Sequence, residues 1–149
     1  MLEIAASIQI TGPPEAVWAV LADLPGYPQW NPFIRKATGE LVVGGKLNCR
    51  IHPENAPSLS FKPVVLTVEP GRELCWRGML LAPGIMDGTH RFVLEANDRG
   101  TLLKQSEVFT GLLTTLLGTP LRAVRKDFER LNEALRKRVE AGSPATTPA

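Results

Sequence analysis

A histidine and a carboxylate in the second half of the chain, His90 and Glu107, are residue types that transfer protons in enzymes and anchor polar groups in binding sites. Gln105 lies close to Glu107 and adds both a donor and an acceptor. His90 is distant from the other two in sequence, so the three meet only if the chain between them folds back. Acid–base chemistry or ligand orientation here therefore depends on the fold of residues 88–109.

This part of the chain carries the pattern of a β-hairpin. Two strands are expected, at Gly88 to Ala96 and at Thr101 to Phe109, and successive residues in each lie on opposite faces of the sheet. The sequence between them, Asn97-Asp98-Arg99-Gly100, is typical of a turn. A loop of two or of four residues gives the same two faces. A three-residue loop would oppose apolar Phe92 to polar Ser106, so we reject that register.

The accepted register gives the inward face a mixed set of side chains: His90, Phe92, Leu94, Leu103, Gln105, Glu107 and Phe109. A buried carboxylate without partners costs several kcal/mol, so we expect Glu107 to have a partner, to meet water in a cavity, or both. In one interpretation His90 and Glu107 form hydrogen bonds with each other or with the backbone in a closed core. In another they are the polar groups of an apolar pocket. The third is a register that turns them outward.

A second candidate for chemistry is Cys49-Arg50-Ile51-His52, whose C-x-x-H spacing superficially suggests zinc ligands. Residues three apart on a strand point to opposite faces, so Cys49 and His52 cannot bind one ion unless the strand is bulged. Neither Cys75 nor His90 completes a site. We therefore expect no metal and no cofactor.

The elements that position these residues are a series of strands between two helical segments. The strands are expected at Leu2–Ile10, Phe33–Ala37, Lys46–His52, Phe61–Val68, Glu73–Leu80, Gly88–Ala96 and Thr101–Phe109. Pro53 to Ser60 is expected to be a polar loop. A short helix is expected from Pro14 to about residue 22, because proline suits the first helical turn.

The clearest single element is an amphipathic helix near the C-terminus. Its apolar stripe recurs every three or four positions and consists of Leu121, Val124, Phe128, Leu131, Leu135 and Val139. Thr119 is suited to cap this helix, with Pro120 at its first position. Alternatively, the helix begins earlier, near the upstream leucines of residues 112–117, and bends at Gly118-Thr119-Pro120. The order of elements predicts an α+β domain in which a curved antiparallel sheet of about seven strands packs against the helix.

An aromatic corner, Tyr27-Pro28-Gln29-Trp30-Asn31-Pro32-Phe33, follows the short helix. Two prolines in this segment predict irregular backbone rather than a regular helix or a central strand. Trp30 is expected either to plug the end of the core or to form a wall of a pocket.

The composition indicates one domain of ordinary size. The chain has 149 residues, a net charge of +2 and two cysteines in apolar runs. We expect a single domain over residues 1–141, a disordered tail over 142–149, and a reduced, cytoplasmic protein. The mild charge argues against a nucleic-acid partner, and no apolar run is long enough for a membrane span. The sequence predicts no particular oligomeric state.

Several segments of the sequence resemble the START-like, or SRPBCC, superfamily, and in particular its bacterial polyketide cyclase/dehydrase and lipid-transport group. The resemblance covers about residues 2–140. The segments that carry it are Pro14-Glu15-Ala16-Val17-Trp18, Leu21-Ala22-Asp23, the aromatic corner, Glu69 to Gly78, Glu107 to Gly111 and Phe128 to Lys137.

The resemblance implies a helix-grip fold, in which an antiparallel sheet of seven strands surrounds a long C-terminal helix. It also implies two short helices within residues 14–31 and an elongated apolar cavity between helix and sheet. Members of the superfamily include lipid and hormone carriers, aromatase/cyclases, hydrolases and chaperone activators, so the fold does not select one activity.

Three functions are open, of which the first is favoured: binding of a small hydrophobic or lipid-like molecule between helix and sheet. Its expected contacts are Trp30, Trp76, Phe92, Leu103, Phe109 and Phe128, with His90, Gln105 and Glu107 fixing its polar end. The second is a polyketide cyclase or dehydratase that uses His90 and Glu107 as acid and base. The third is a protein-interaction or chaperone-regulator module that uses the apolar loops around Ile85 and Leu112.

Overall fold

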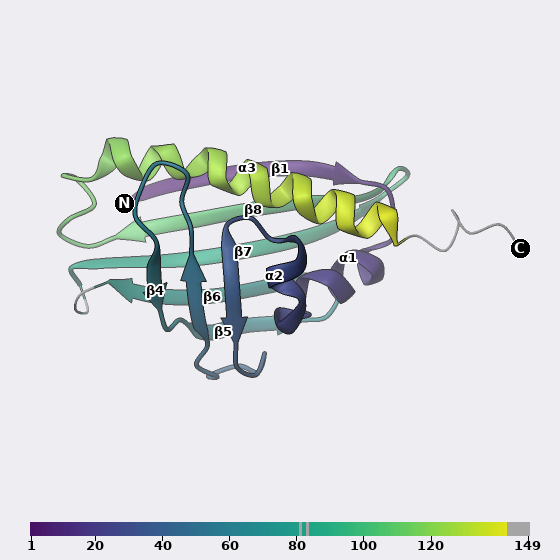
Figure 1. The fold of residues 1–149 in the computed structure, drawn as a ribbon, viewed down its shortest axis with the longest axis horizontal. Coiled ribbons are helices and arrows are strands. Elements are labelled where there is room, and N and C mark those ends of the chain that lie inside the picture. Colours follow the sequence, from purple (N-terminus) through teal and green to yellow (C-terminus); the bar gives the residue numbers. More distant parts are fainter. Residues whose placement is uncertain (81, 83, 143–149) are drawn as a thin grey trace, which may run out of the picture.

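The computed structural model of the chain describes residues 1–80, 82 and 84–142, and it consists of two antiparallel sheets and one long helix (Figure 1). All but the first residue of the predicted tail, 142–149, lies outside the described residues, as does part of the apolar loop before Ile85. None of the helices that the structure describes is long and apolar enough to cross a membrane.

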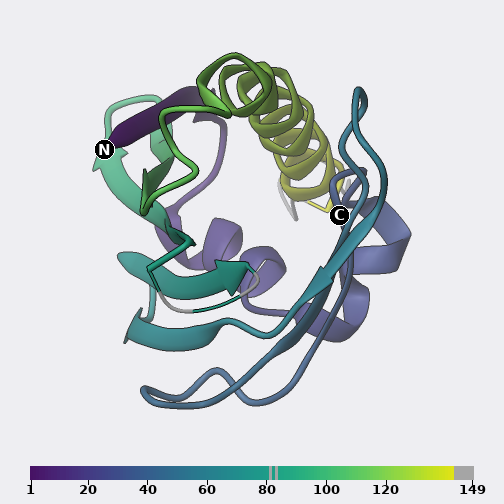
Figure 2. The same ribbon diagram turned by 90° about the vertical axis from the view of Figure 1, so that its left-hand side faces the viewer.

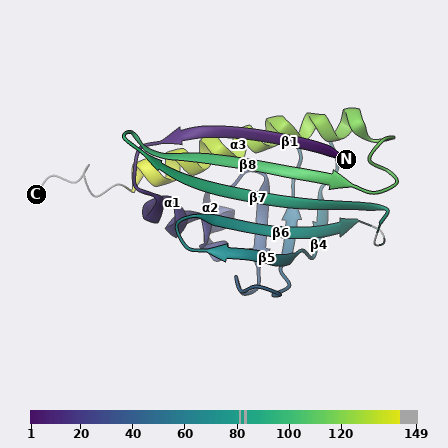
Figure 3. The same cartoon turned by 180° about the vertical axis from the view of Figure 1, so that it is seen from behind.

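The larger sheet has five strands in the order β1-β8-β7-β6-β5 (Figure 3). Their bounds are β1 Leu2–Ile10, β5 Val64–Glu69, β6 Glu73–Leu80, β7 Met86–Asn97 and β8 Gly100–Thr110. The smaller sheet has the order β2-β3-β4, with β2 Ile34–Thr38, β3 Asn48–Ile51 and β4 Leu59–Phe61. A bridge between Lys46 and Val64 links the two sheets. The view along the helix shows how they curve around it (Figure 2).

The helix-grip fold is thus confirmed, with one more strand than expected. Residues Phe61 to Val68, predicted as one strand, are divided between β4 in the smaller sheet and β5 in the larger sheet. The division falls at Lys62 and Pro63. Because proline lacks a backbone N–H, it interrupts the hydrogen-bond ladder and allows the chain to change sheets here.

The hairpin of β7 and β8 has the predicted register. Asn97 pairs with Gly100 around a two-residue loop, and His90 lies directly opposite Glu107. Gly100 has a φ of +123°, and a Cβ atom there would lie 2.3 Å from the carbonyl oxygen of Ile10. Glycine is therefore required at the position where the hairpin begins to pair with the end of β1.

The long helix α3, Gly118–Ala141, buries the predicted apolar stripe. Leu121, Phe128, Leu131, Leu135 and Val139 are buried, and Val124 is half-buried. The predicted cap is wrong: Leu117 occupies the N-cap position without a side-chain hydrogen bond, and Thr119 lies inside the first turn. Proline is tolerated in that turn because its missing N–H has no partner within the helix there.

The aromatic corner contains one helical turn, contrary to the expectation of irregular backbone. After α1, Pro14–Leu21, and a 3₁₀ turn at Leu24–Gly26, the helix α2 spans Tyr27–Trp30. Pro28 lies in its first turn, where a proline is tolerated. The two short helices implied by the family resemblance are therefore present.

Asn31 ends α2 and starts the smaller sheet. This fully buried side chain accepts hydrogen bonds through Oδ1 from the backbone N–H groups of Phe33 at 3.0 Å and Ile34 at 2.8 Å. Tyr27 is also fully buried, and its hydroxyl donates to the carbonyl oxygen of Leu21 at 2.6 Å. Burial raises the pKa of this phenol, so it remains a neutral donor.

We predict that Asn31→Ala lowers the free energy of unfolding by about 2 kcal/mol, because two buried backbone donors lose their acceptor. Urea denaturation followed by circular dichroism measures the change. Asn55→Ala, at an exposed loop position, is the control and should change stability by less than about 0.5 kcal/mol. Equal effects of the two substitutions would contradict the capping role.

Candidate functional site

A cavity of about 230 Å³ lies between the N-terminal half of α3 and the two sheets. Helix α3 contributes Leu121 and Val124, and the smaller sheet contributes Phe33 and Phe61, among others. The complete lining is Phe33, Ile34, Ile51, Pro53, Ala56, Pro57, Leu59, Phe61, Trp76, Gly78, Met79, Met86, Gly88, His90, Glu107, Phe109, Leu117, Pro120, Leu121 and Val124. It is apolar apart from His90 and Glu107.

Aromatic rings pack against one another behind the cavity wall. The ring of Phe128 lies 5.9 Å from that of Phe33 and 5.0 Å from that of His90, measured between centroids. Phe128 and the later apolar residues of α3 are buried in the solid core and do not line the cavity. The helix therefore packs tightly along its C-terminal half and covers a hollow along its N-terminal half.

Two glycines keep the floor of the cavity open. Gly78 on β6 lies opposite Gly88 on β7, and both line the cavity. A Cβ atom at Gly88 would lie 2.3 Å from Oε2 of Glu107, and one at Gly78 would lie 3.0 Å from the ring of Phe61. The missing side chains thus leave room for the carboxylate and for the aromatic wall.

A chain of hydrogen bonds connects the polar wall of the cavity to α3. Gln105 donates through Nε2 to Oδ1 of Asn132 at 2.7 Å and to the carbonyl oxygen of Phe128 at 3.3 Å. Its Oε1 lies 2.8 Å from Nε2 of His90, and Nδ1 of the same ring lies 3.0 Å from Oε1 of Glu107. His90 is 4% exposed and Gln105 is 1% exposed, so the contact between them is shielded from solvent.

This chain of hydrogen bonds fixes the positions of the protons on the His90 ring. A backbone carbonyl can only accept, so the amide of Gln105 must direct Nε2 to Phe128 and Oε1 to His90. An amide oxygen also only accepts, so Nε2 of His90 carries a proton. Across the 3.0 Å contact with Glu107 one further proton is needed, because otherwise two acceptors would face each other. The His90–Glu107 pair therefore shares one proton along that contact.

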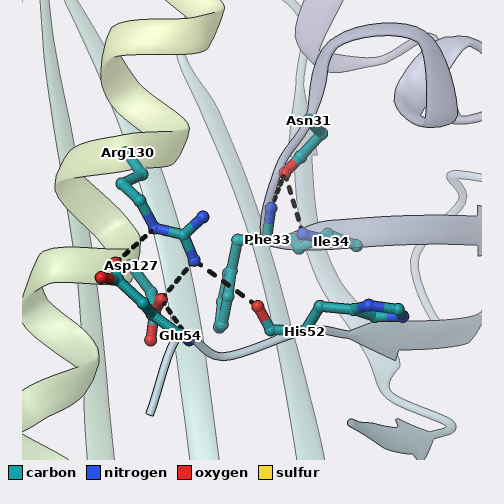
Figure 4. A network of polar contacts seen from close by, with 7 residues as sticks. All are labelled: Asn31, Phe33, Ile34, His52, Glu54, Asp127 and Arg130. Atoms are coloured by element: carbon teal, nitrogen blue, oxygen red, sulfur yellow. Dashed lines mark hydrogen bonds and ion pairs between the residues drawn. The ribbon is translucent and has the colours of Figure 1, made fainter.

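A polar cluster holds the loop of residues 53–57 against α3 (Figure 4). Buried Asp127 accepts from the backbone N–H of Glu54 at 3.0 Å and pairs with Arg130. Arg130 also pairs with Oε2 of Glu54 at 3.3 Å and lies 3.5 Å from the carbonyl oxygen of His52. The cluster secures the loop that supplies Pro53, Ala56 and Pro57 to the cavity wall.

The structure brings together four of the nine residues that the sequence suggested for ligand contact: Trp76, His90, Glu107 and Phe109 line the cavity. The other five lie outside its lining. Phe92, Leu103 and Phe128 are fully buried in the core, Gln105 lies behind the His90 ring, and half-buried Trp30 packs edge-on against Tyr27 at 5.2 Å.

Sequence reasoning missed the wall contributed by the segment that joins β3 to β4. Residues 53–60 were expected to form a polar loop, yet Pro53, Ala56, Pro57 and Leu59 line the cavity. The apolar residues within this loop were the available signal. Of the two apolar loop residues, Leu112 is 78% exposed and Ile85 is half-buried, and neither lines the cavity.

Neither cysteine belongs to a cluster suited to metal binding within the part of the chain that the structure describes. Cys49 is buried and His52 is exposed, and no group of three metal-ligating side chains occurs among the residues that the structure describes. Burial raises the pKa of the Cys49 thiol to about 12 and also raises the pKa of the Cys75 thiol. Both thiols are thus protonated and unreactive near neutral pH.

A family model described as polyketide cyclase / dehydrase and lipid transport matches residues 1–140. The chain belongs to this family. The match runs from β1 to the last turn of α3 and confirms the resemblance seen in the aromatic corner and the final helix. No curated protein matches the chain at a significant level.

Solved structures of other proteins share this family member's fold. The Zhui aromatase/cyclase from Streptomyces sp. R1128 has a TM-score of 0.76 at 19% identity over 99% of both chains. A START superfamily protein from Mycobacterium smegmatis has a TM-score of 0.75 at 18% identity, over 95% of this chain and 99% of its own. Protein MLL2253 from Mesorhizobium loti has a TM-score of 0.75 at 20% identity with the same coverage. At these identities the likeness establishes the fold alone.

We predict that His90 holds a fixed proton on Nε2. Histidine ring ¹H–¹⁵N spectra should show one protonated Nε2 in slow exchange, because the Gln105 amide accepts from it in a dry site. The exposed His52 is the internal control and should show rapid exchange. Gln105→Leu should remove the slow signal, and a proton found only on Nδ1 of His90 would contradict the geometry.

Proposed function

We propose that this protein binds a small hydrophobic molecule in the cavity between α3 and the sheets. The observation that carries the proposal is the nearly continuous apolar lining around about 230 Å³ of space, with one carboxylate and one imidazole on a single wall. An apolar pocket with a few convergent polar groups is the usual form of a small-molecule site.

The size of the cavity limits the ligand. An engineered apolar cavity of about 150 Å³ admits a single benzene ring. The larger volume here supports a ligand of about two fused rings or a short acyl chain. Trp76, Phe61 and Phe109 supply flat surfaces to an aromatic ligand, and Met86 supplies an adaptable one.

The rim of the cavity supports entry beside α3. Met79 is 49% exposed and Pro120 is exposed, although both belong to the lining. The loop of residues 53–57 forms the opposite part of the rim and is held by the Asp127 and Arg130 cluster. A ligand can therefore enter between the first turns of α3 and this loop.

We predict that Val124→Trp weakens binding of 1-naphthol at least about ten-fold, because an indole in place of the half-buried Val124 fills the cavity. Isothermal titration calorimetry measures the dissociation constant. Ala123→Trp is the matched control, since Ala123 is the adjacent, exposed position on the same helix. Equal affinities in the two variants would rule out this cavity as the binding site.

A second candidate function is acid–base catalysis on a dicarbonyl substrate, of the cyclase or dehydratase type. It is favoured by the position of Oε2 of Glu107, which has no hydrogen-bond partner among the described residues and lies above Gly88 in the cavity. Both nitrogens of His90 are engaged, so Glu107 is the group that would touch the substrate. His90 would act as a positioning residue.

We predict for this candidate that the protein accelerates deuterium exchange at the carbon between the carbonyls of benzoylacetone, as followed by NMR in D₂O. Glu107→Gln should lower the protein-dependent rate about 100-fold, because an amide cannot take up the proton. Its dissociation constant for benzoylacetone should change much less. Loss of binding and exchange in equal measure would instead support carriage without catalysis.

A further inference from the structure

The polar wall of the cavity presents a hydrogen-bond acceptor to the ligand whatever the location of the shared proton. If the proton lies on Nδ1 of His90, Glu107 is a carboxylate and Oε2 accepts. If the proton lies on Oε1 of Glu107, Oε2 is a carbonyl-type oxygen and again accepts. The proton cannot leave the contact without opposing two acceptors at 3.0 Å.

Among the polar side-chain atoms of His90 and Glu107, Oε2 is the one that a ligand can reach. Oε1 of Glu107 is engaged by His90, and both ring nitrogens of His90 are engaged. The side chain of Glu107 is 18% exposed, whereas that of His90 is 5% exposed. A Cβ atom at Gly88 would almost touch Oε2, which shows that this oxygen projects over the glycine floor of the cavity.

The lining offers nothing to neutralise an anion. It contains no lysine or arginine among the residues that the structure describes. The nearest cationic candidate, His90, gives a neutral unit together with Glu107 because the pair holds one shared proton beyond the Nε2 hydrogen. A bound carboxylate would therefore lose its water, gain no cation and lie beside an acceptor, all of which weaken its binding.

We propose that the cavity selects uncharged hydrophobic molecules that carry a hydrogen-bond donor, such as phenols or alcohols, and rejects carboxylates of the same shape. This inference rests on the proposed function, that the cavity is a binding site. The donor of the ligand bonds to Oε2 of Glu107, and its rings contact Trp76, Phe61 and Phe109. Glu107 is thus the residue that determines specificity.

Three probes of one ring system test the proposal: naphthalene, 1-naphthol and 1-naphthoate, titrated calorimetrically at about pH 8, where a carboxylic acid is ionised. Wild-type protein should bind 1-naphthol about ten-fold more tightly than naphthalene, because of the added hydrogen bond. It should bind 1-naphthoate at least about 100-fold more weakly than 1-naphthol.

Glu107→Leu removes the acceptor and should abolish the preference for 1-naphthol over naphthalene while naphthalene still binds. Glu107→Gln serves as the variant that preserves the fold: its amide nitrogen donates to Nδ1 of His90 and its oxygen still faces the cavity as an acceptor. It should therefore keep the preference for 1-naphthol over both naphthalene and 1-naphthoate. Glu73→Leu is the matched control, because Glu73 is a half-buried carboxylate on β6 that pairs with Arg91 outside the cavity. It should leave all three affinities unchanged.

The outcomes separate the two levels of the proposal. The first possibility is that naphthalene binds, but 1-naphthol binds no more tightly and 1-naphthoate no more weakly than naphthalene. The proposed ligand class is then wrong, and the binding site stands. If none of the three probes binds, the proposed function fails and the ligand class fails with it. A preference for 1-naphthol that survives in Glu107→Leu would overturn the assignment of specificity to Glu107.

Discussion

The hydrogen bonds of one buried amide connect the long helix to the polar wall of the cavity. Gln105 donates to Phe128 and Asn132 on α3, and this leaves its oxygen directed at His90. The ring of His90 in turn directs its second nitrogen at Glu107. Each group fixes the orientation of the next, and all but the last are excluded from water. The wall is therefore positioned by regular secondary structure, which is more rigid than a loop.

The same helix performs two different tasks along its length. Its C-terminal half buries large side chains such as Phe128 and Leu135 in a solid core. Its N-terminal half covers the cavity, where the Asp127 and Arg130 cluster holds the loop of residues 53–57 close to the helix. Asp127 and Gln105 make buried polar contacts at the boundary between the two halves. These contacts favour one distance between the helix and the sheets, since a buried polar group without a partner would be costly.

Much of the fold was predictable because it follows from local periodicity. Alternation and a turn sequence gave the β7–β8 register, and with it the neighbourhood of His90 and Glu107. The apolar stripe gave the buried face of α3. The division of one predicted strand at Pro63 was not predicted, because a proline is compatible both with an edge strand and with a change of sheet. The helical turn at Tyr27 was not predicted, because the segment contains prolines, although a proline is tolerated in the first turn of a helix.

By itself the sequence determined the family, the helix-grip arrangement and the face on which the polar residues lie, because each depends on spacing along the chain. Only the tertiary structure decided whether these residues meet a cavity or a closed core. That outcome depends on packing between distant segments: the glycine pair Gly78 and Gly88 leaves space, and the loop of residues 53–57 encloses it. Packing of this kind arises from side-chain volumes in three dimensions, and a linear pattern does not encode their fit.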